Sequence, residues 1–267
     1  MLRKLFYILC LTAIIVLRTF AQTSWVSFLQ QTKTKPTINL TSSNNNIVSF
    51  TVQINGMETS AKTISEVQYQ SLSIPDCEIM SKEGSPQLPF ITKLIAVPDC
   101  DNVSISVSNS NMLSFSDYEI IPAPRYEHKK LPDGRDQLVQ VFEEDKSVYS
   151  NNADFPGKFG EIIETGYVRD QKVVRVAIYP IQFNPADKKI KAYTNFNIVL
   201  TFSNPKSSVN KELGIFRNIM YHASLNYELS GISASTKDVN KAMGKKLAKV
   251  ASGSVTRVTN LKYACRC

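Results

Sequence analysis

The sequence predicts a mainly β protein, an antiparallel β-sandwich or jelly roll with a short helical segment near its C-terminus. Two observations carry this prediction. Apolar and polar side chains alternate along several short stretches, which is typical of strands with one face on a core. After residue 205 the alternation gives way to apolar residues three to four apart, which is typical of an amphipathic helix.

The N-terminus has the pattern of an export signal over residues 1–21. A basic start, Met1–Lys4, precedes an apolar run over Leu5–Leu17 that is too short to span a bilayer with ease. Small residues follow this run, so we expect signal cleavage between Ala21 and Gln22. The alternative is a membrane anchor, which the short run disfavours. We therefore expect an exported protein, periplasmic or extracellular, with no membrane contact after cleavage.

The mature chain divides into four stretches by composition and period. The first is polar and is predicted to be a flexible lead-in. The second alternates, the third has helical spacing, and the fourth is rich in Lys. They are residues 22–46 (lead-in), 47–205 (β-sandwich), 206–230 (helical junction segment) and 231–267 (basic tail).

Strands are predicted where alternation or β-branched composition is clearest. The best signals are Val48–Ile54, Val103–Val107 and Phe196–Phe202. Phe183–Tyr193 predicts a hairpin, because Pro185 and Asp187 favour a turn between apolar flanks. Further strands are predicted near residues 64–72, 90–97, 116–121, 137–142, 161–168 and 173–181.

The formal net charge of +8 comes from one end of the chain. Residues 206–267 hold 11 Lys and Arg against 3 Asp and Glu, whereas residues 1–205 hold 20 of each. A nucleic-acid site needs a folded basic face with interleaved aromatic rings, which this end lacks. We therefore interpret it as a solvated tail and expect no nucleic-acid partner.

Four cysteines follow the signal. Cys77 and Cys100 each end a Pro-Asp-Cys triplet, and a disulfide between them would stabilise the fold by about 3 kcal/mol in the chain-entropy model. The alternative is two free or separately buried thiols. Cys265 and Cys267 supply too few ligands for a metal site, so none is predicted.

No sequence motif predicts catalysis or a cofactor. HExxH, GxSxG, Walker and GxGxxG patterns are all absent. The histidines are His128 and His222, and an enzyme would need one of them to meet Cys77 or Cys100 in the fold. We expect a chain without catalytic activity of its own.

A stiff turn, Gly84-Ser85-Pro86-Gln87-Leu88-Pro89, carries no reactive group. Pro86 and Pro89 fix φ and remove two donors, which suits a strand entry or a sandwich corner. Gly84 is expected to supply a positive φ. Gly84, Pro86, Leu88 and Pro89 therefore predict a turn with a structural role.

The turn and the strand that follows it resemble the pro-region of gingipain-like cysteine peptidases, peptidase family C25. Four later stretches resemble this pro-region in the same order, and the resemblance covers about residues 60–228. It implies a sandwich pro-domain that keeps a peptidase latent and helps it to fold. The four stretches are Tyr118–Pro124, Tyr149–Gly157, Ile178–Ser203 and Phe216–Tyr227.

The resemblance also implies an inhibitory loop, because one loop of such pro-domains crosses the active-site cleft and can place a basic side chain in the specificity pocket. The equivalent here is Pro124–Gln137. Counted back from Phe155-Pro156-Gly157, Arg135 is the best match to the inhibitory basic residue of the family, and Lys130 is the second. The alternative is a solvated loop with ordinary surface charge. The loop also offers Lys129 and Arg125.

The relatives implied by the resemblance continue into a catalytic domain with a His–Cys dyad, and this chain ends near the junction. We expect its partner to be such a catalytic domain, with the chain acting as a free-standing inhibitor or chaperone, or being a truncated and inactive fragment. A second class of function is a stand-alone secreted sandwich that binds a glycan or protein. The single Trp25, in the lead-in, disfavours a glycan platform.

Overall fold

The computed structural model describes residues 23–168, 171–206 and 224–226. The predicted cleavage site, most of the helical junction segment, His222 and the basic tail lie outside these ranges. Within them, no helix is long and apolar enough to cross a membrane.

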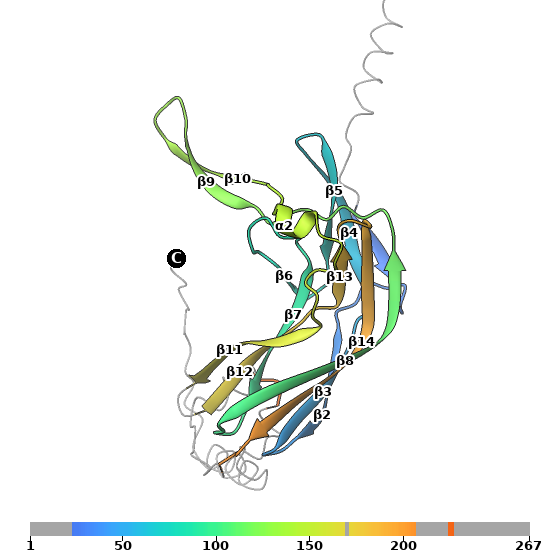
Figure 1. Ribbon diagram of the computed structural model, residues 1–267, viewed down its shortest axis with the longest axis vertical. Coiled ribbons are helices and arrows are strands. Elements are labelled where there is room, and N and C mark those ends of the chain that lie inside the picture. The colour runs from blue at the N-terminus through green and yellow to red at the C-terminus, as the bar shows by residue number, and fades with distance from the viewer. Residues whose placement is uncertain (1–22, 169–170, 207–223, 227–267) are drawn as a thin grey trace, which may run out of the picture.

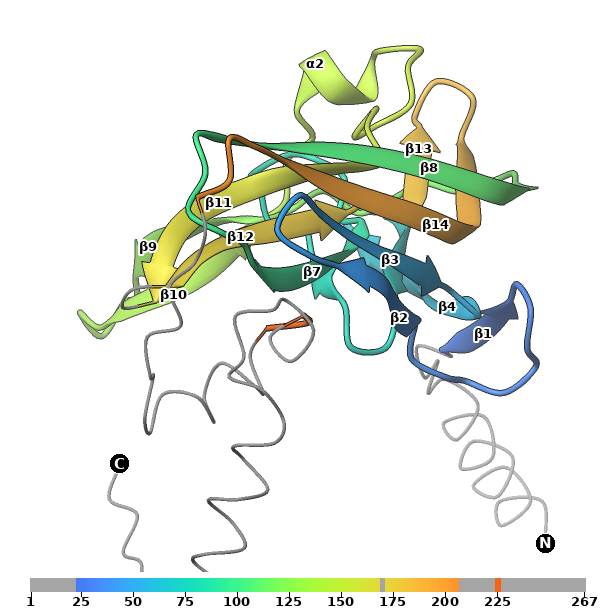
Figure 2. The same ribbon diagram turned by 90° about the horizontal axis from the view of Figure 1, so that it is seen from below.

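Two antiparallel sheets pack face to face and enclose one core (Figures 1 and 2). In the first sheet β14 is central, because β8 pairs with one of its edges while β13 and β3 share the other, and β2 extends the sheet beyond β3. The second sheet has the order β11-β12-β7-β6. The first consists of β2 (Thr37–Ser43), β3 (Ile47–Gln53), β8 (Asn102–Phe115), β13 (Ile181–Asn184) and β14 (Lys189–Ser203), and the second of β6 (Glu78–Ile79), β7 (Pro89–Ala96), β11 (Gly160–Val168) and β12 (Gln171–Ile178).

The core forms where alternating side chains of the two sheets meet. On β14 every second residue from Ile190 to Phe202 is buried, and Ile198 lies opposite Phe50 of β3. Ile95 of β7 and Val176 of β12 contribute from the second sheet. The predicted fold class is therefore confirmed, as is the hairpin of β13 and β14.

A third sheet packs β1 (Ser24–Ser27) and β5 (Val67–Ser73) on either side of β4 (Gly56–Ile64). Trp25 of β1 lies so close over Gly56 that a Cβ there would clash with its ring. β1 and β2 both fall in the segment expected to be a flexible lead-in. That prediction is wrong, because backbone pairing and the inward side chains of Ile38 and Leu40 hold this segment on the sandwich.

Two further local predictions are wrong. Residues 116–121 are not a strand, because β8 ends at Phe115, Asp117 has a φ of 65°, and Ile120 makes only an isolated bridge. Ser224–Asn226, which lie within the predicted helical junction segment, are not helical. Ser224 pairs instead with Leu94 of β7.

The core predicts a strong dependence on Phe183, which is fully buried. Phe183→Ala should lower the free energy of unfolding by about 3–5 kcal/mol, because it removes apolar contacts and leaves a cavity. Met112 is 52% exposed, so Met112→Ala should change it by no more than about 0.5 kcal/mol. Urea titrations followed by circular dichroism would measure both values, and equal effects would contradict this core.

Candidate functional site

The predicted inhibitory loop forms an antiparallel hairpin of β9 (Arg125–Lys130) and β10 (Asp136–Val141). Six residue pairs join the strands, and neither strand pairs with any other strand of the described chain. The hairpin projects away from the two main sheets (Figure 1). Its tip is therefore presented on a two-stranded arm.

The tip of the hairpin is a compact turn that contains Arg135, one of the predicted basic residues. The N–H of Leu131 donates to the carbonyl of Arg135 (2.8 Å), and Gly134 has a φ of 84°. The Arg135 guanidinium lies 2.6 Å from the Asp133 carboxylate, and its Nε donates to the same group. These hydrogen bonds lower the pKa of Asp133. Arg135 is nevertheless widely exposed.

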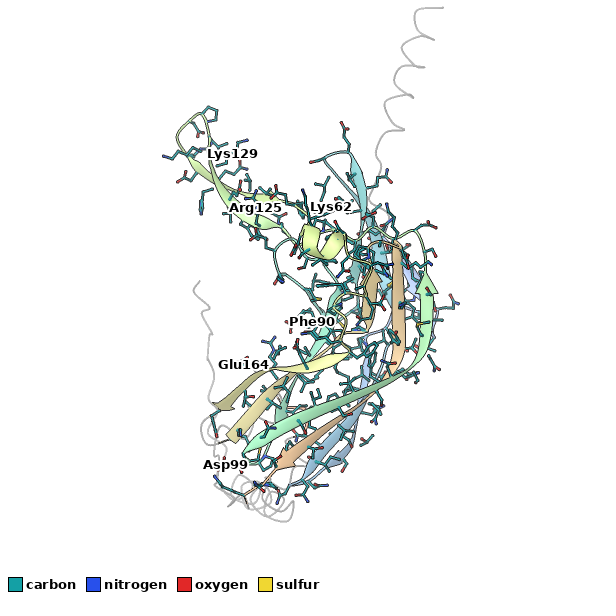
Figure 3. All side chains as sticks on the ribbon, in the orientation of Figure 1. Lys62, Phe90, Asp99, Arg125, Lys129 and Glu164 are labelled. Carbon is teal, nitrogen blue, oxygen red and sulfur yellow. The ribbon has the colours of Figure 1, made fainter. Side chains whose placement is uncertain are left out.

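The other predicted basic residues divide into two groups. Arg125 lies at the base of the hairpin (Figure 3). Its guanidinium contacts Glu127 and, at 3.1 Å, Glu143. Lys129 and Lys130 are exposed at the tip end of β9, and neither forms an ion pair with any described residue. Lys129, Lys130 and Arg135 are thus the cations at the end of the arm, whereas Arg125 belongs to its foot.

The Gly84–Pro89 turn holds both feet of the hairpin. The N–H of Gly84 donates to the carbonyl of Ala123 (2.9 Å), and the N–H of Ala123 donates to the carbonyl of Ser85 (2.8 Å), just before β9. Behind β10, the N–H of Asp145 donates to the carbonyl of Gly84 (2.9 Å). One turn therefore fixes the chain on entry to the hairpin and on exit from it.

Each predicted turn residue has a visible role. Gly84 has a φ of 73°, so the expected positive φ is confirmed. Pro86 bridges to Pro122, Leu88 is 1% exposed in the core, and Pro89 begins β7. The sequence did not reveal that this turn contacts the basic hairpin, because the contact joins segments that are far apart along the chain.

Tyrosines and a short helix reinforce the exit foot. The Tyr69 hydroxyl donates to the Glu144 carboxylate (2.8 Å), and burial together with this carboxylate raises the pKa of Tyr69 to about 12. Asp145 caps α2 (Lys146–Tyr149), and the Tyr149 hydroxyl donates to the carbonyl of Ile120 (2.7 Å). These bonds tie the exit of the hairpin to the sandwich.

A comparison with protein families decides the class of the chain. The family model of the C25 propeptide (Propeptide_C25) matches residues 29–234. The chain belongs to this family. The match covers the basic hairpin and the turn beneath it, and its residues are those of a propeptide rather than of a peptidase domain.

Curated relatives of this C25 propeptide are gingipains of Porphyromonas gingivalis. Gingipain R1 is 25% identical over 185 residues, which are 66% of this chain and 18% of that protein. Gingipain R2 is 23% identical over 184 residues, 66% of this chain and 24% of that protein. The chain therefore spans less than a quarter of the length of the curated relatives it matches.

Two solved structures share the fold of this C25 propeptide. One is the complex of the pro- and mature domains of RgpB from Porphyromonas gingivalis, with a TM-score of 0.61 and 19% identity over 73% of this chain and 100% of that one. The other concerns zymogenic latency of gingipain K from the same organism, with a TM-score of 0.54 and 19% identity over 68% of this chain and 99% of that one. Both support the sandwich architecture.

Of the two alternatives for Cys77 and Cys100, the structure shows two free thiols and not a disulfide. Cys77 precedes Glu78, which pairs with Phe90 near the start of β7, whereas Cys100 follows the far end of that strand. Six residues from Phe90 to the end of β7 span roughly 20 Å, and a disulfide needs Cα atoms within about 7 Å. Cys100 is buried at that far end.

The described residues also give the enzyme alternative no support. Burial raises the pKa of Cys77 to about 12, which disfavours the nucleophilic thiolate. His128 lies on β9 opposite Leu138, in the projecting hairpin, whereas both cysteines lie in the sandwich. No group of three or more His, Cys, Asp or Glu side chains able to hold a metal occurs in the described ranges.

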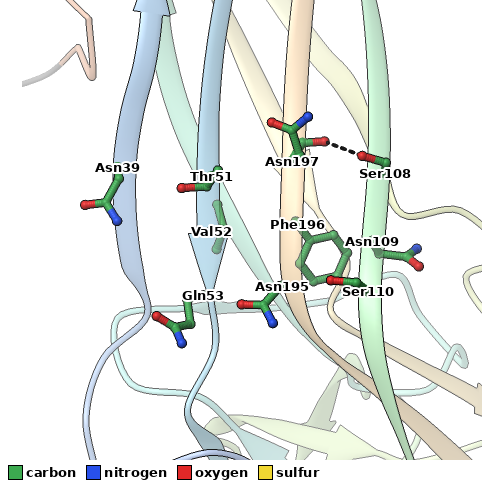
Figure 4. A pocket seen from close by; sticks show the side chains of 10 residues that line it. All are labelled: Asn39, Thr51, Val52, Gln53, Ser108, Asn109, Ser110, Asn195, Phe196 and Asn197. Atoms are coloured by element: carbon green, nitrogen blue, oxygen red, sulfur yellow. Dashed lines mark hydrogen bonds between the residues drawn. The ribbon is translucent and has the colours of Figure 1, made fainter.

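A shallow groove of about 410 Å³ crosses the outer face of the first sheet (Figure 4). No charged side chain lines it, so it offers only neutral hydrogen-bonding groups. Its one aromatic ring, Phe196, is 2% exposed and cannot serve as a stacking platform for a sugar. The lining residues are Asn39, Thr51, Val52, Gln53, Ser108, Asn109, Ser110, Asn195, Phe196 and Asn197.

Two glycines with positive φ allow a matched test of the turn. A Cβ on Gly84 would lie 3.0 Å from the Asp145 nitrogen, whereas one on Gly134 would meet nothing within 4 Å. Both Ala substitutions should cost about 1 kcal/mol through backbone strain, and Gly84→Ala should cost about 1–2 kcal/mol more. Urea unfolding would measure the difference, and equal losses would show that Gly84 does not anchor the hairpin.

The free thiols predict a specific labelling pattern. Alkylation under denaturing, non-reducing conditions should modify both Cys77 and Cys100, as peptide mass spectrometry would show. In the folded protein at pH 8, Cys77 should react slowly, because raising its pKa to about 12 leaves on the order of a thousandfold less thiolate. Cys100→Ser should leave that rate unchanged. A disulfide-linked Cys77–Cys100 peptide would contradict the assignment.

Proposed function

We propose that this C25 propeptide is an exported latency inhibitor and folding aid for the catalytic domain of a gingipain-like cysteine peptidase. The observation that carries the proposal is the basic hairpin, which stands clear of the sandwich on a fixed foot. Membership of the propeptide family supports the same role. The solved complex of RgpB pro- and mature domains supports a catalytic domain as the partner.

In the proposed complex the hairpin enters the active-site cleft. A two-stranded hairpin leaves N–H and C=O groups unpaired along both outer edges, and an extended substrate offers the same groups to a peptidase cleft. The hairpin can therefore occupy the place of substrate. Water and substrate are shut out while it remains there.

The tip cations are proposed to reach the specificity pocket, with Arg135 first and the pair Lys129 and Lys130 second. Arg135 must exchange Asp133 for an acidic group of the pocket. This exchange costs little, because water screens an ion pair between exposed groups. Arg125 is not proposed as the blocking residue, because Glu127 and Glu143 hold it at the foot.

Inhibition of an active gingipain-type cysteine peptidase by purified residues 22–267 tests this function. Arg135→Ala should weaken inhibition at least tenfold, which corresponds to about 1.4 kcal/mol. Lys189→Ala removes an exposed positive charge at the β13–β14 turn and should leave the inhibition constant unchanged.

The double variant Lys129→Ala/Lys130→Ala completes this test. Weaker inhibition by the double variant alone would retain the function and assign the pocket to the lysine pair. Equal inhibition by all variants would show that the tip cations do not block the cleft. Absence of inhibition by the folded wild-type chain would refute the proposed function.

A further inference from the structure

The second sheet has one edge that its own strands do not complete. β12 pairs with β7 along Ile91–Ala96, but on the opposite edge β6 reaches only Pro89 and Phe90. The remaining backbone groups of β7 on that side must find other partners, because buried N–H and C=O groups are costly to leave unpaired.

A segment from far along the chain supplies these partners. Ser224 forms a parallel bridge with Leu94, and the N–H of Leu225 donates to the Leu94 carbonyl (3.0 Å). The side chain of Asn226 accepts from the N–H of Ala96 (2.8 Å) and donates to the carbonyl of the same residue (2.7 Å). The N–H of Ala96 also donates to the Ser224 hydroxyl (3.0 Å), so the side chains of Ser224 and Asn226 together satisfy both backbone groups of Ala96, as a paired strand would.

The same segment also closes the side of the sandwich between β7 and β2. The Asn226 carboxamide donates to the Ser43 hydroxyl (3.3 Å) at the end of β2, and the side chain of Leu225 packs against the main core. Asn226 is 1% exposed and Ser224 7%. Residues this well buried are part of the folded domain.

The connection to this segment starts and ends at one corner of the fold. The N–H of Lys206 donates to the carbonyl of Asp99 (2.7 Å), three residues beyond Ala96. Residues 207–223 then lead to Ser224, which is back beside β7. The closeness of the two anchors gives the segment a high effective concentration at this edge, which three residues free in solution would lack.

We propose that the edge of β7 at Leu94–Ala96 is a strand-docking site, which Ser224–Asn226 of the same chain occupy. This docking fixes the point at which the chain leaves the propeptide domain. Cleavage within residues 207–223 breaks the covalent connection between Lys206 and Ser224, here called the tether. The docked segment and the residues after it can then dissociate from the sandwich. A cut after Asn226 leaves the site occupied. The position of a cut thus decides whether the sandwich stays closed, independently of any inhibition of a peptidase.

Amide hydrogen exchange of the full chain tests the docking. Asn226→Ala should speed exchange of the Ala96 and Leu225 amides at least tenfold, and Ser224→Ala should do so to a smaller extent. The control Asn197→Ala removes an exposed Asn from the opposite sheet and should change neither amide. Phe50 and Ile198, paired in the first sheet, report global unfolding and should keep their protection. Unchanged protection of Ala96 in the double variant Ser224→Ala/Asn226→Ala would overturn the proposal, because both side chains accept from its N–H.

The cuts are tested by inserting a site-specific protease sequence in the full chain, either within residues 207–223 or after residue 230. Cleavage at the first position should release the downstream fragment on size exclusion and speed exchange at Ala96 at least tenfold. Cleavage at the second should leave Ala96 protected. The same protection after both cuts would refute the tether mechanism.

Discussion

A single left-handed residue, Gly84, determines how the basic hairpin leaves the sandwich. Its N–H donates to the chain before β9 and its C=O accepts from the chain after β10, so both feet of the hairpin converge on one residue. A Cβ at this position would press on the Asp145 backbone, which explains why glycine is needed for space as well as for conformation. The direction of the arm therefore depends on a turn that carries no reactive group.

The hairpin cannot set its own direction. A two-stranded sheet has no core, and Tyr126 and Leu138 are 59% and 56% exposed on one of its faces. Its orientation must come from the foot, where Arg125 pairs with Glu143 and Tyr69 holds Glu144. Substitutions at the foot should therefore alter the orientation of the tip even though the residues of the tip itself are unchanged.

Sequence alone predicted most of the sandwich, because alternation in β3, β8 and β14 reflects burial of one face directly. It missed β2, whose Ile38 and Leu40 alternate within a polar segment that was judged by composition. The hairpin was located by resemblance, but its anchoring at Gly84 was not, since no local pattern records a contact between distant segments. The same reason explains the wrong helix at Ser224–Asn226, where three residues take their conformation from the edge of β7.

The backbone anchors of the arm and of the chain exit are neutral, although the foot also carries the Arg125–Glu143 ion pair. The Gly84 turn and the docking of Asn226 on Ala96 use hydrogen bonds between uncharged groups, which salt screens little and which do not titrate near neutral pH. The tip presents exposed cations, whose attraction to an acidic partner weakens as ionic strength rises. Salt should therefore weaken engagement of the tip while the Gly84 turn and the chain exit keep their hydrogen bonds, so loss of binding at high salt would report on the charged contacts of the arm and not on unfolding of the domain.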